Sequence, residues 1–143
     1  MPNPDGRTRV IIENVDPEID CGRFPIKRVP GESVTVEADI YADGHDAVSA
    51  VLLHKEMGET KWRETPMEFI VNDRWWGTFR VRRVGHACYT IRAWVDHYKT
   101  WSLDFAKRLG AGQDVSVDRI IGAKLVEDAI PHAPEPEAGA LRT

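Results

Sequence analysis

The sequence predicts an antiparallel β-sandwich of immunoglobulin-like type, followed by a C-terminal α-helix. Between about residues 9 and 95, short segments alternate apolar with polar residues. Turn residues separate these segments at spacings of roughly 8 to 12 residues, which is typical of sandwich folds. No helical period intervenes among them, and this disfavours a parallel α/β fold. The segment from Asp114 to Ile130 carries apolar residues at helical spacing.

Three strands are expected in the first part of the chain. Val10 to Ile12 opens the set, and a second extended piece is expected over residues 23–29, after the turn at Asp16-Pro17. The clearest strand follows the turn signal Pro30-Gly31. Its apolar residues alternate with polar ones, as in a strand buried on one face; they are Val34, Val36, Ala38 and Ile40.

Four further segments continue the pattern, at residues 47–54, from residue 61, at residues 75–81 and at residues 87–95. Neighbouring side chains on a strand point to opposite faces. Because Trp75 shares its face with Phe79 and Val81, we expect it in the core, and we expect Trp76 on the outer face. Trp94 belongs by the same alternation to the polar face of the last strand.

The pattern changes at about Thr100, and a helix is predicted from about Val115 to Ala129 with Asp114 as its N-cap. Its apolar stripe contains Val117, Ile120, Ile121 and Leu125. The predicted parts are a sandwich over 8–103, a helical segment over 104–130 and a proline-rich flexible tail over 131–143. A single amphipathic helix needs a surface on which to bury its stripe.

Composition excludes several classes of function. The chain has 143 residues, a net charge of -4 and a pI of about 5.7. Its basic residues are dispersed, so nucleic acid is not an expected partner. No run of about 18 apolar residues is present, so no membrane span is expected. Nothing resembles a secretion signal, and a cytoplasmic location is the expectation.

No catalytic, cofactor or metal site is predicted. Cys21 and Cys88 lie outside any Cys-x-x-Cys motif and are expected as free thiols. A single disulfide between them is the alternative. We interpret Cys88 as a small packing residue. The segment 43–46 contains ligand-type side chains, but an Asp-Gly turn explains it as well. The arginines at 74, 80, 82 and 83 are most simply a solvated strand face.

Four aromatic residues are candidates for contacts with a partner or an alpha-glucan: Trp76, Trp94, Tyr41 and Trp101. An outward tryptophan can anchor a protein interface or stack on a sugar ring. A sugar platform requires Trp76, Trp94 and Tyr41 to meet on one outer face. Trp101 is expected to cover the junction between the sandwich and the helix.

Several segments, in this order and spacing, resemble the N-terminal domain of the bacterial alpha-1,4-glucan:maltose-1-phosphate maltosyltransferases, which belong to the alpha-amylase superfamily. The similarity extends from about Arg7 to Ile130. The segments are RVIIENV (9–15), CGRFPIKR (21–28), VEADI (36–40), DGHD (43–46), RAWVD (92–96), TW (100–101), AGQD (111–114) and GAKL (122–125).

The resemblance implies a sandwich that precedes a catalytic barrel, contributes to a homodimer and is interrupted by a helical insertion. The helix after Gln113 would begin that insertion, after which the chain returns to finish the sandwich. A (β/α)₈ barrel needs about 250 residues, so this chain contains neither the barrel nor its catalytic carboxylates. Without the returning strand, one sheet edge is expected to be open.

Three functions are therefore considered. The favoured one is a non-catalytic assembly and dimerisation domain of an enzyme that transfers maltosyl from maltose 1-phosphate to an alpha-1,4-glucan. In that case the outward Trp76 is an interface anchor. The alternative is an alpha-glucan-binding module that uses Trp76, Trp94 and Tyr41. A small independent enzyme would require a pocket with a converging His/Asp pair.

Overall fold

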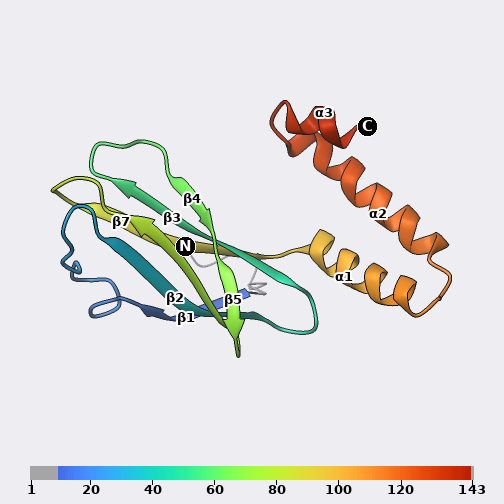
Figure 1. Cartoon of the computed structure of the whole chain (residues 1–143), viewed down its shortest axis with the longest axis horizontal. Coiled ribbons are helices and arrows are strands. Elements are labelled where there is room, and N and C mark those ends of the chain that lie inside the picture. The colour runs from blue at the N-terminus through green and yellow to red at the C-terminus, as the bar shows by residue number, and fades with distance from the viewer. Residues whose placement is uncertain (1–9, 143) are drawn as a thin grey trace, which may run out of the picture. The chain divides into compact units, whose positions relative to one another are not determined.

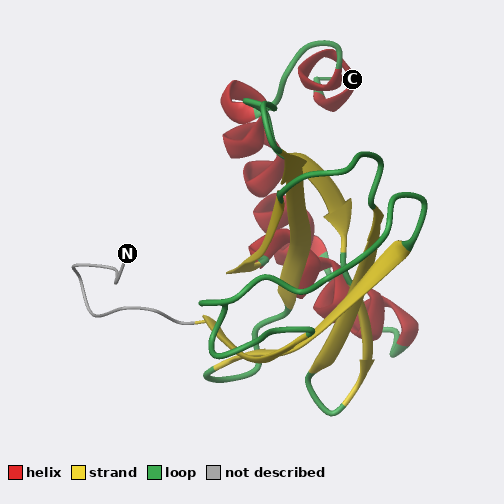
Figure 2. Cartoon of the chain, turned by 90° about the vertical axis from the view of Figure 1, so that its left-hand side faces the viewer, coloured by secondary structure: helices red, strands yellow, loops and turns green. Residues whose placement is uncertain are grey.

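The computed structural model describes residues 10–142 (Figure 1). The chain consists of two compact units; the first extends to Val95 and the second begins at Asp96. The first unit is built of strands and the second of helices (Figure 2). The expected start of the sandwich at residue 8 and the first residue of the similar segment 9–15 lie outside the described residues.

The first unit contains two antiparallel sheets that form a sandwich, so the predicted fold class is confirmed. One sheet contains, in spatial order, β1 (Val10–Asp16), β2 (Ser33–Ala42), β6 (Arg74–Arg80) and β5 (Glu68–Val71). The other contains, in spatial order, β4 (Arg63–Pro66), β3 (Val48–Glu56) and β7 (Ala87–Val95).

The core lies between the two sheets and is filled mainly from β2, β3 and β6. The predicted alternation in β2 is confirmed, because its inward residues are buried and its outward ones are not. Trp75 is buried as predicted, and its Nε1 donates a hydrogen bond to the carbonyl of Ile40 at 3.2 Å. Gly77 allows the sheets to approach, since a Cβ there would lie 3.3 Å from Leu52 and 3.2 Å from Met67.

Two features of the sandwich differ from the sequence prediction. Residues 23–29 do not form a strand and contribute only the isolated bridge between Ile19 and Phe24. Pro25 lies within this segment and Pro30 directly follows it, and proline has no N–H to donate to a sheet. β5 was not expected as a separate strand, because only Met67 separates it from β4, at the point where the chain passes from one sheet to the other.

The second unit contains α1 (His97–Gly110), α2 (Ser116–Ala129), the 3₁₀ turn η1 (Ile130–His132) and α3 (Glu137–Leu141). The sequence prediction placed the end of the sandwich at residue 103, but the helical part already begins at His97. The carboxylate of Asp96 caps α1 by accepting a hydrogen bond from the backbone N–H of Lys99 at 2.9 Å. This cap follows β7 directly, so no loop separates the strand from the helix.

α2 confirms the predicted helix, but the residue at its N-cap position is Val115, which makes no side-chain capping bond. Asp114, one residue earlier, accepts from the backbone N–H of Ser116 at 3.0 Å. The prediction that residues 131–143 form a flexible tail is wrong for α3, because its Ala138 is buried. The proline at position 136 ends the preceding loop and serves as the N-cap of α3.

Candidate interaction surfaces

The outer face of the sheet β1-β2-β6-β5 carries two of the four candidate aromatics. Trp76 lies between Glu37 of β2 and Glu68 of β5 in the strand register, and it is half-buried. Tyr41 lies on the same face farther along β2, where its hydroxyl donates to the Glu13 carboxylate at 3.1 Å. Donation to this carboxylate raises the pKa of Tyr41 above its ordinary value.

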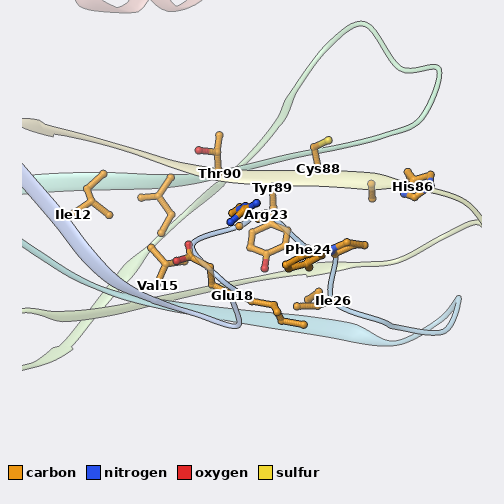
Figure 3. Close-up of a pocket in the computed structure, with 15 residues that line it drawn as sticks. Ile12, Val15, Glu18, Arg23, Phe24, Ile26, His86, Cys88, Tyr89 and Thr90 are labelled. Atoms are coloured by element: carbon orange, nitrogen blue, oxygen red, sulfur yellow. The ribbon is translucent and has the colours of Figure 1, made fainter. Parts of the chain in front are cut away.

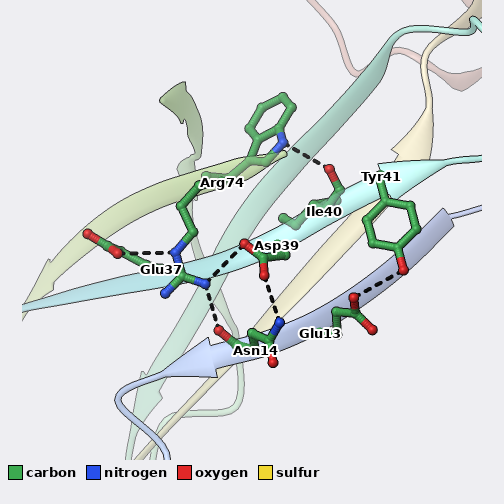
Figure 4. Close-up of polar contacts among 8 residues, drawn as sticks. Glu13, Asn14, Glu37, Asp39, Ile40, Tyr41 and Arg74 are labelled. Atoms are coloured by element: carbon green, nitrogen blue, oxygen red, sulfur yellow. Dashed lines mark hydrogen bonds and ion pairs between the residues drawn. The ribbon is translucent and has the colours of Figure 1, made fainter. Parts of the chain in front are cut away.

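A polar network lies beside Tyr41 on this face (Figure 4), and in the strand register its residues stand between Tyr41 and Trp76. The Arg74 guanidinium donates to Glu37 and Asp39, each at 3.2 Å, and to the carbonyl of Asn14 at 2.8 Å. Asn14 also donates to Asp39 at 2.7 Å. This bond, together with Arg74, holds the pKa of Asp39 below its usual range. These polar side chains lie between the two rings in the strand register, and Tyr41 and Trp76 therefore do not form one aromatic surface.

Trp94 lies on the outer face of the other sheet, β4-β3-β7, opposite Ser49 of β3. The structure thus does not bring Trp76, Trp94 and Tyr41 together on one face, as a shared platform would require. Trp94 instead shares its face with Trp62, which the sequence interpretation left out. Both rings are substantially exposed, Trp94 at 39% and Trp62 at 40%.

Trp101 holds the two long helices of the second unit together. Its Nε1 donates to the carbonyl of Asp118 at 2.7 Å, and its ring packs against Phe105 of the same helix with a centroid separation of 5.2 Å. The ring also lies directly over Gly122 of α2. Arg108 of α1 forms an ion pair with Asp118 at 2.5 Å. These contacts give Trp101 a structural role within the helical unit.

The arginines at 74, 80, 82 and 83 do not form a single anion site. Arg80 donates to the carbonyl of Gly31 at 3.1 Å, and Arg83 pairs with the buried Glu56 at 2.9 Å. Glu56 also accepts from the backbone N–H of Arg82 at 2.8 Å. The Arg83 bond and this backbone bond hold the pKa of Glu56 below its ordinary value.

A buried histidine lies beside this carboxylate in the sandwich. The His54 ring stacks on Phe79 with a centroid separation of 4.8 Å, and its Nδ1 has no hydrogen-bond partner among the described residues. Burial lowers the pKa of His54, and the nearby Arg63 and Arg82 guanidinium groups add to that effect. Its surroundings therefore favour a neutral imidazole packed as a core side chain.

In the described part of the chain, no group of three or more His, Cys, Asp or Glu side chains gathers closely enough to hold a metal ion. Cys21 and Cys88 are both free and exposed. The interpretation of Cys88 as a packing residue is wrong, because it lies on the outward face of β7 opposite Lys55. No helix among residues 10–142 is long and apolar enough to cross a membrane.

A pocket of about 650 Å³ lies along β7 (Figure 3). Apolar side chains from three segments line it, namely β1, the loop at residues 17–31 and β7. They include Ile12, Val15, Ile19, Phe24, Ile26 and Ile91. Tyr89 points from β7 towards Phe24 and Ile26, and its hydroxyl donates to the carbonyl of Pro17. Burial raises the pKa of Tyr89.

The sheets and surfaces described above define an immunoglobulin-like β-sandwich module with an appended helical unit. A model of the family described as alpha-1,4-glucan:maltose-1-phosphate maltosyltransferase, domain N/S, matches residues 8–143, and the chain belongs to this family. The resemblance drawn from the sequence segments is thereby confirmed.

Curated relatives carry the name alpha-1,4-glucan:maltose-1-phosphate maltosyltransferase. One from Chlorobaculum tepidum is 51% identical over 137 residues, which cover 96% of this chain and 20% of the relative. One from Myxococcus xanthus is 43% identical over 128 residues, covering 87% of this chain and 19% of the relative. One from Salinibacter ruber is 36% identical over 141 residues, covering 96% of this chain and 21% of the relative. The chain thus spans about a fifth of the length of these relatives.

Proposed function

We propose that this chain is the non-catalytic N-terminal assembly domain of a maltosyltransferase, and that it contributes to a homodimer. The parent enzyme would transfer maltosyl from maltose 1-phosphate to an alpha-1,4-glucan, the reaction that its relatives' names describe. Its catalytic barrel, of the alpha-amylase type, would lie in the part of the parent protein beyond this chain. We also propose a cytoplasmic location, which suits two free, exposed thiols.

The observation that carries this proposal is the uncovered edge of β7. β7 pairs with β3 along its whole length, and no described strand pairs with its other edge. Its inward residues Tyr89, Ile91 and Ala93 belong to the core but are only partly buried, whereas the inward residues of β2 are almost fully buried. An unpaired edge beside an incompletely covered core is a surface that natural proteins cover.

The pocket beside β7 has the properties of a slot for one more strand. Its lining is mostly apolar, and the edge of β7 offers backbone hydrogen bonds along one side. A strand added there would extend the sheet and cover Tyr89 and Ile91. The remainder of the parent enzyme would supply this strand, in keeping with the resemblance, which implies a chain that returns to finish the sandwich.

Hydrogen exchange tests this assembly role. In the isolated chain, backbone amides of β7 that face the open edge should exchange rapidly, and in the parent enzyme they should be protected, because a paired amide exchanges only on opening. The amides of β2 provide the internal control, since β2 is paired on both sides in the chain. Equal exchange of β7 in both proteins would contradict the proposal.

Trp76 is the proposed anchor for the second subunit. It is a large, half-buried aromatic residue on an outer sheet face, and such residues often dominate binding energy at interfaces. Light scattering should show a dimer of the parent enzyme that dissociates more readily with Trp76→Ala. Thr78→Ala, on the same face of β6, is the matched control. A dimer unaffected by Trp76→Ala would remove Trp76 from the interface.

A further inference from the structure

The outer face of the sheet β4-β3-β7 carries two exposed tryptophans at opposite ends. Trp94 of β7 lies opposite Ser49, near the start of β3. Trp62 directly precedes β4, and the Lys55 ammonium group, near the end of β3, lies 4.7 Å from the centre of its ring. Because both rings are about 40% exposed, each presents an aromatic surface to solvent.

The span between the two tryptophans suits an extended ligand. From Ser49 to Lys55 the strand β3 covers about 20 Å at a rise of about 3.3 Å per residue. The displacement from β7 to β4 across β3 adds to this separation. A single sugar ring cannot contact both indoles over such a distance, whereas a linear chain of sugars can.

A polar strip connects the two ends of this face. Arg92 of β7 forms an ion pair with Glu64 of β4 at 2.8 Å, and the pair spans the intervening strand β3. Val51 and Leu53 of β3 lie on this outward side and are only 9% exposed. The strip therefore presents both hydrogen-bond donors and acceptors above a layer of apolar side chains.

This arrangement favours a carbohydrate over a protein partner. The centre of a protein interface is apolar and depleted of charge, but the centre of this face is an ion pair whose side chains are 58% and 51% exposed. Burying that pair under a protein would remove its hydration. Sugar hydroxyls can instead donate to the Glu64 carboxylate and accept from the Arg92 guanidinium.

We propose that the outer face of the β4-β3-β7 sheet binds a linear alpha-1,4-glucan chain, with Trp62 and Trp94 stacking on sugar rings at its two ends and the Arg92–Glu64 pair bonding to hydroxyls between them. This site differs from the proposed dimer anchor, because Trp76 lies on the other sheet. The inference rests on the proposed function for its sugar class, since that function makes an alpha-glucan the substrate of the parent enzyme.

Calorimetric titration of the purified chain with maltoheptaose tests the site. Trp62→Ala and Trp94→Ala should each weaken binding roughly tenfold, because each removes one stacking surface. Trp76→Ala, a tryptophan on the opposite sheet, is the matched control and should leave affinity unchanged. Circular dichroism of each variant verifies its fold. A series of shorter maltodextrins should show affinity rising with chain length until both indoles are engaged.

Three outcomes would overturn this inference. Maltoheptaose binding that survives both substitutions, or that is lost in Trp76→Ala, would locate the glucan elsewhere. No binding at millimolar glucan would mean that the face is not a sugar site. A change of mass in Trp94→Ala by light scattering would identify the face as a protein interface. Because β7 protection and the Trp76 dimer are measured separately, failure of glucan binding would leave the assembly proposal standing.

Discussion

The sandwich and the helical unit differ in the kind of contact that stabilises each of them internally. In the sandwich, the inward residues of β2 and β3 form a continuous apolar core, with Val36, Ala38 and Leu52 fully buried. In the helical unit, α1 has no fully buried residue, and the buried residues of α2 are Asp118 and Gly122. The sandwich depends on many equivalent apolar contacts, whereas the two long helices depend on a few specific ones around Trp101.

The exposed stripe of α2 illustrates the difference. Val117, Ile120 and Ile121 follow helical spacing, yet they are 68%, 70% and 48% exposed. The face of α2 that contacts α1 contains a glycine and an aspartate instead. Periodicity therefore located the helix correctly but did not identify the face that packs within this chain.

Truncating a sandwich core residue should have the largest effect on stability. We expect Leu52→Ala to lower the free energy of unfolding by about 2–5 kcal/mol, because it leaves a cavity among fully packed neighbours. Val117→Ala on the stripe of α2 should change it by less than about 0.5 kcal/mol. Urea unfolding measures both. Similar losses from the two substitutions would show that the stripe is covered in solution, for example by a second copy.

A methyl group at Gly122 should destabilise the helical unit. Its Cβ would lie 2.1 Å from the Trp101 ring, so the contact between α1 and α2 must open. We expect Gly122→Ala to cost about 1–3 kcal/mol, the usual range for overpacking. Hydrogen exchange in α1 and α2 measures the loss locally, apart from the sandwich.

Gly110→Ala is the matched control for this prediction, because a Cβ at Gly110 meets nothing within 4 Å. It should be neutral or slightly stabilising, since alanine is the better helix former. Combining Gly122→Ala with Trp101→Ala should cost less than the sum of the two single substitutions. Additive losses would mean that Trp101 does not contact Gly122 in solution.

Acid should weaken the sandwich through His54. The pKa of His54 in the folded state lies below its ordinary value of 6.5, so between these two values the unfolded chain binds the proton and the folded chain does not. Stability should therefore fall as pH is lowered through about 6.5. Chemical unfolding over this pH range should show a smaller slope for His54→Phe, which keeps a flat ring beside Phe79. An unchanged slope would assign the effect to other groups.

The smallest effect is expected on the outward side of β7. Cys88 is exposed, so Cys88→Ser should change the free energy of unfolding by less than about 0.5 kcal/mol. A thiol reagent should modify both Cys88 and Cys21 in the native chain without denaturant. If Cys88 reacted only after unfolding, then its surface would be covered in solution, and the open edge of β7 would need to be reconsidered.

Local patterns in the sequence determined a large part of this structure. The alternation in β2 predicted its buried face, and the adjacent tryptophans of β6 were assigned correctly, with Trp75 in the core and Trp76 outside. α2 was predicted almost to its ends. These features depend on period and on turn residues that lie next to one another in the chain, so one sequence is enough to reveal them.

α1 was missed although its local signals were present. Asp96 is a good N-cap, Lys107 and Arg108 lie in the last turn, and Trp101 and Phe105 are one helical turn apart. Tyr98, Trp101, Phe105 and Leu109 also recur at intervals of three and four residues, which is a helical period. The charged residues between them hid this period, because the segment does not alternate cleanly as a strand would.

The tertiary structure alone decided which surfaces the candidate residues share. Alternation shows whether a side chain points inward or outward, but it does not show which sheet a strand joins, because pairing connects residues far apart in the sequence. Trp76 and Trp94 are both outward as predicted, yet they lie on opposite faces of the sandwich, and Trp94 gains Trp62 as its companion. Long-range strand order, which no local period encodes, thus determines which aromatic residues can act together.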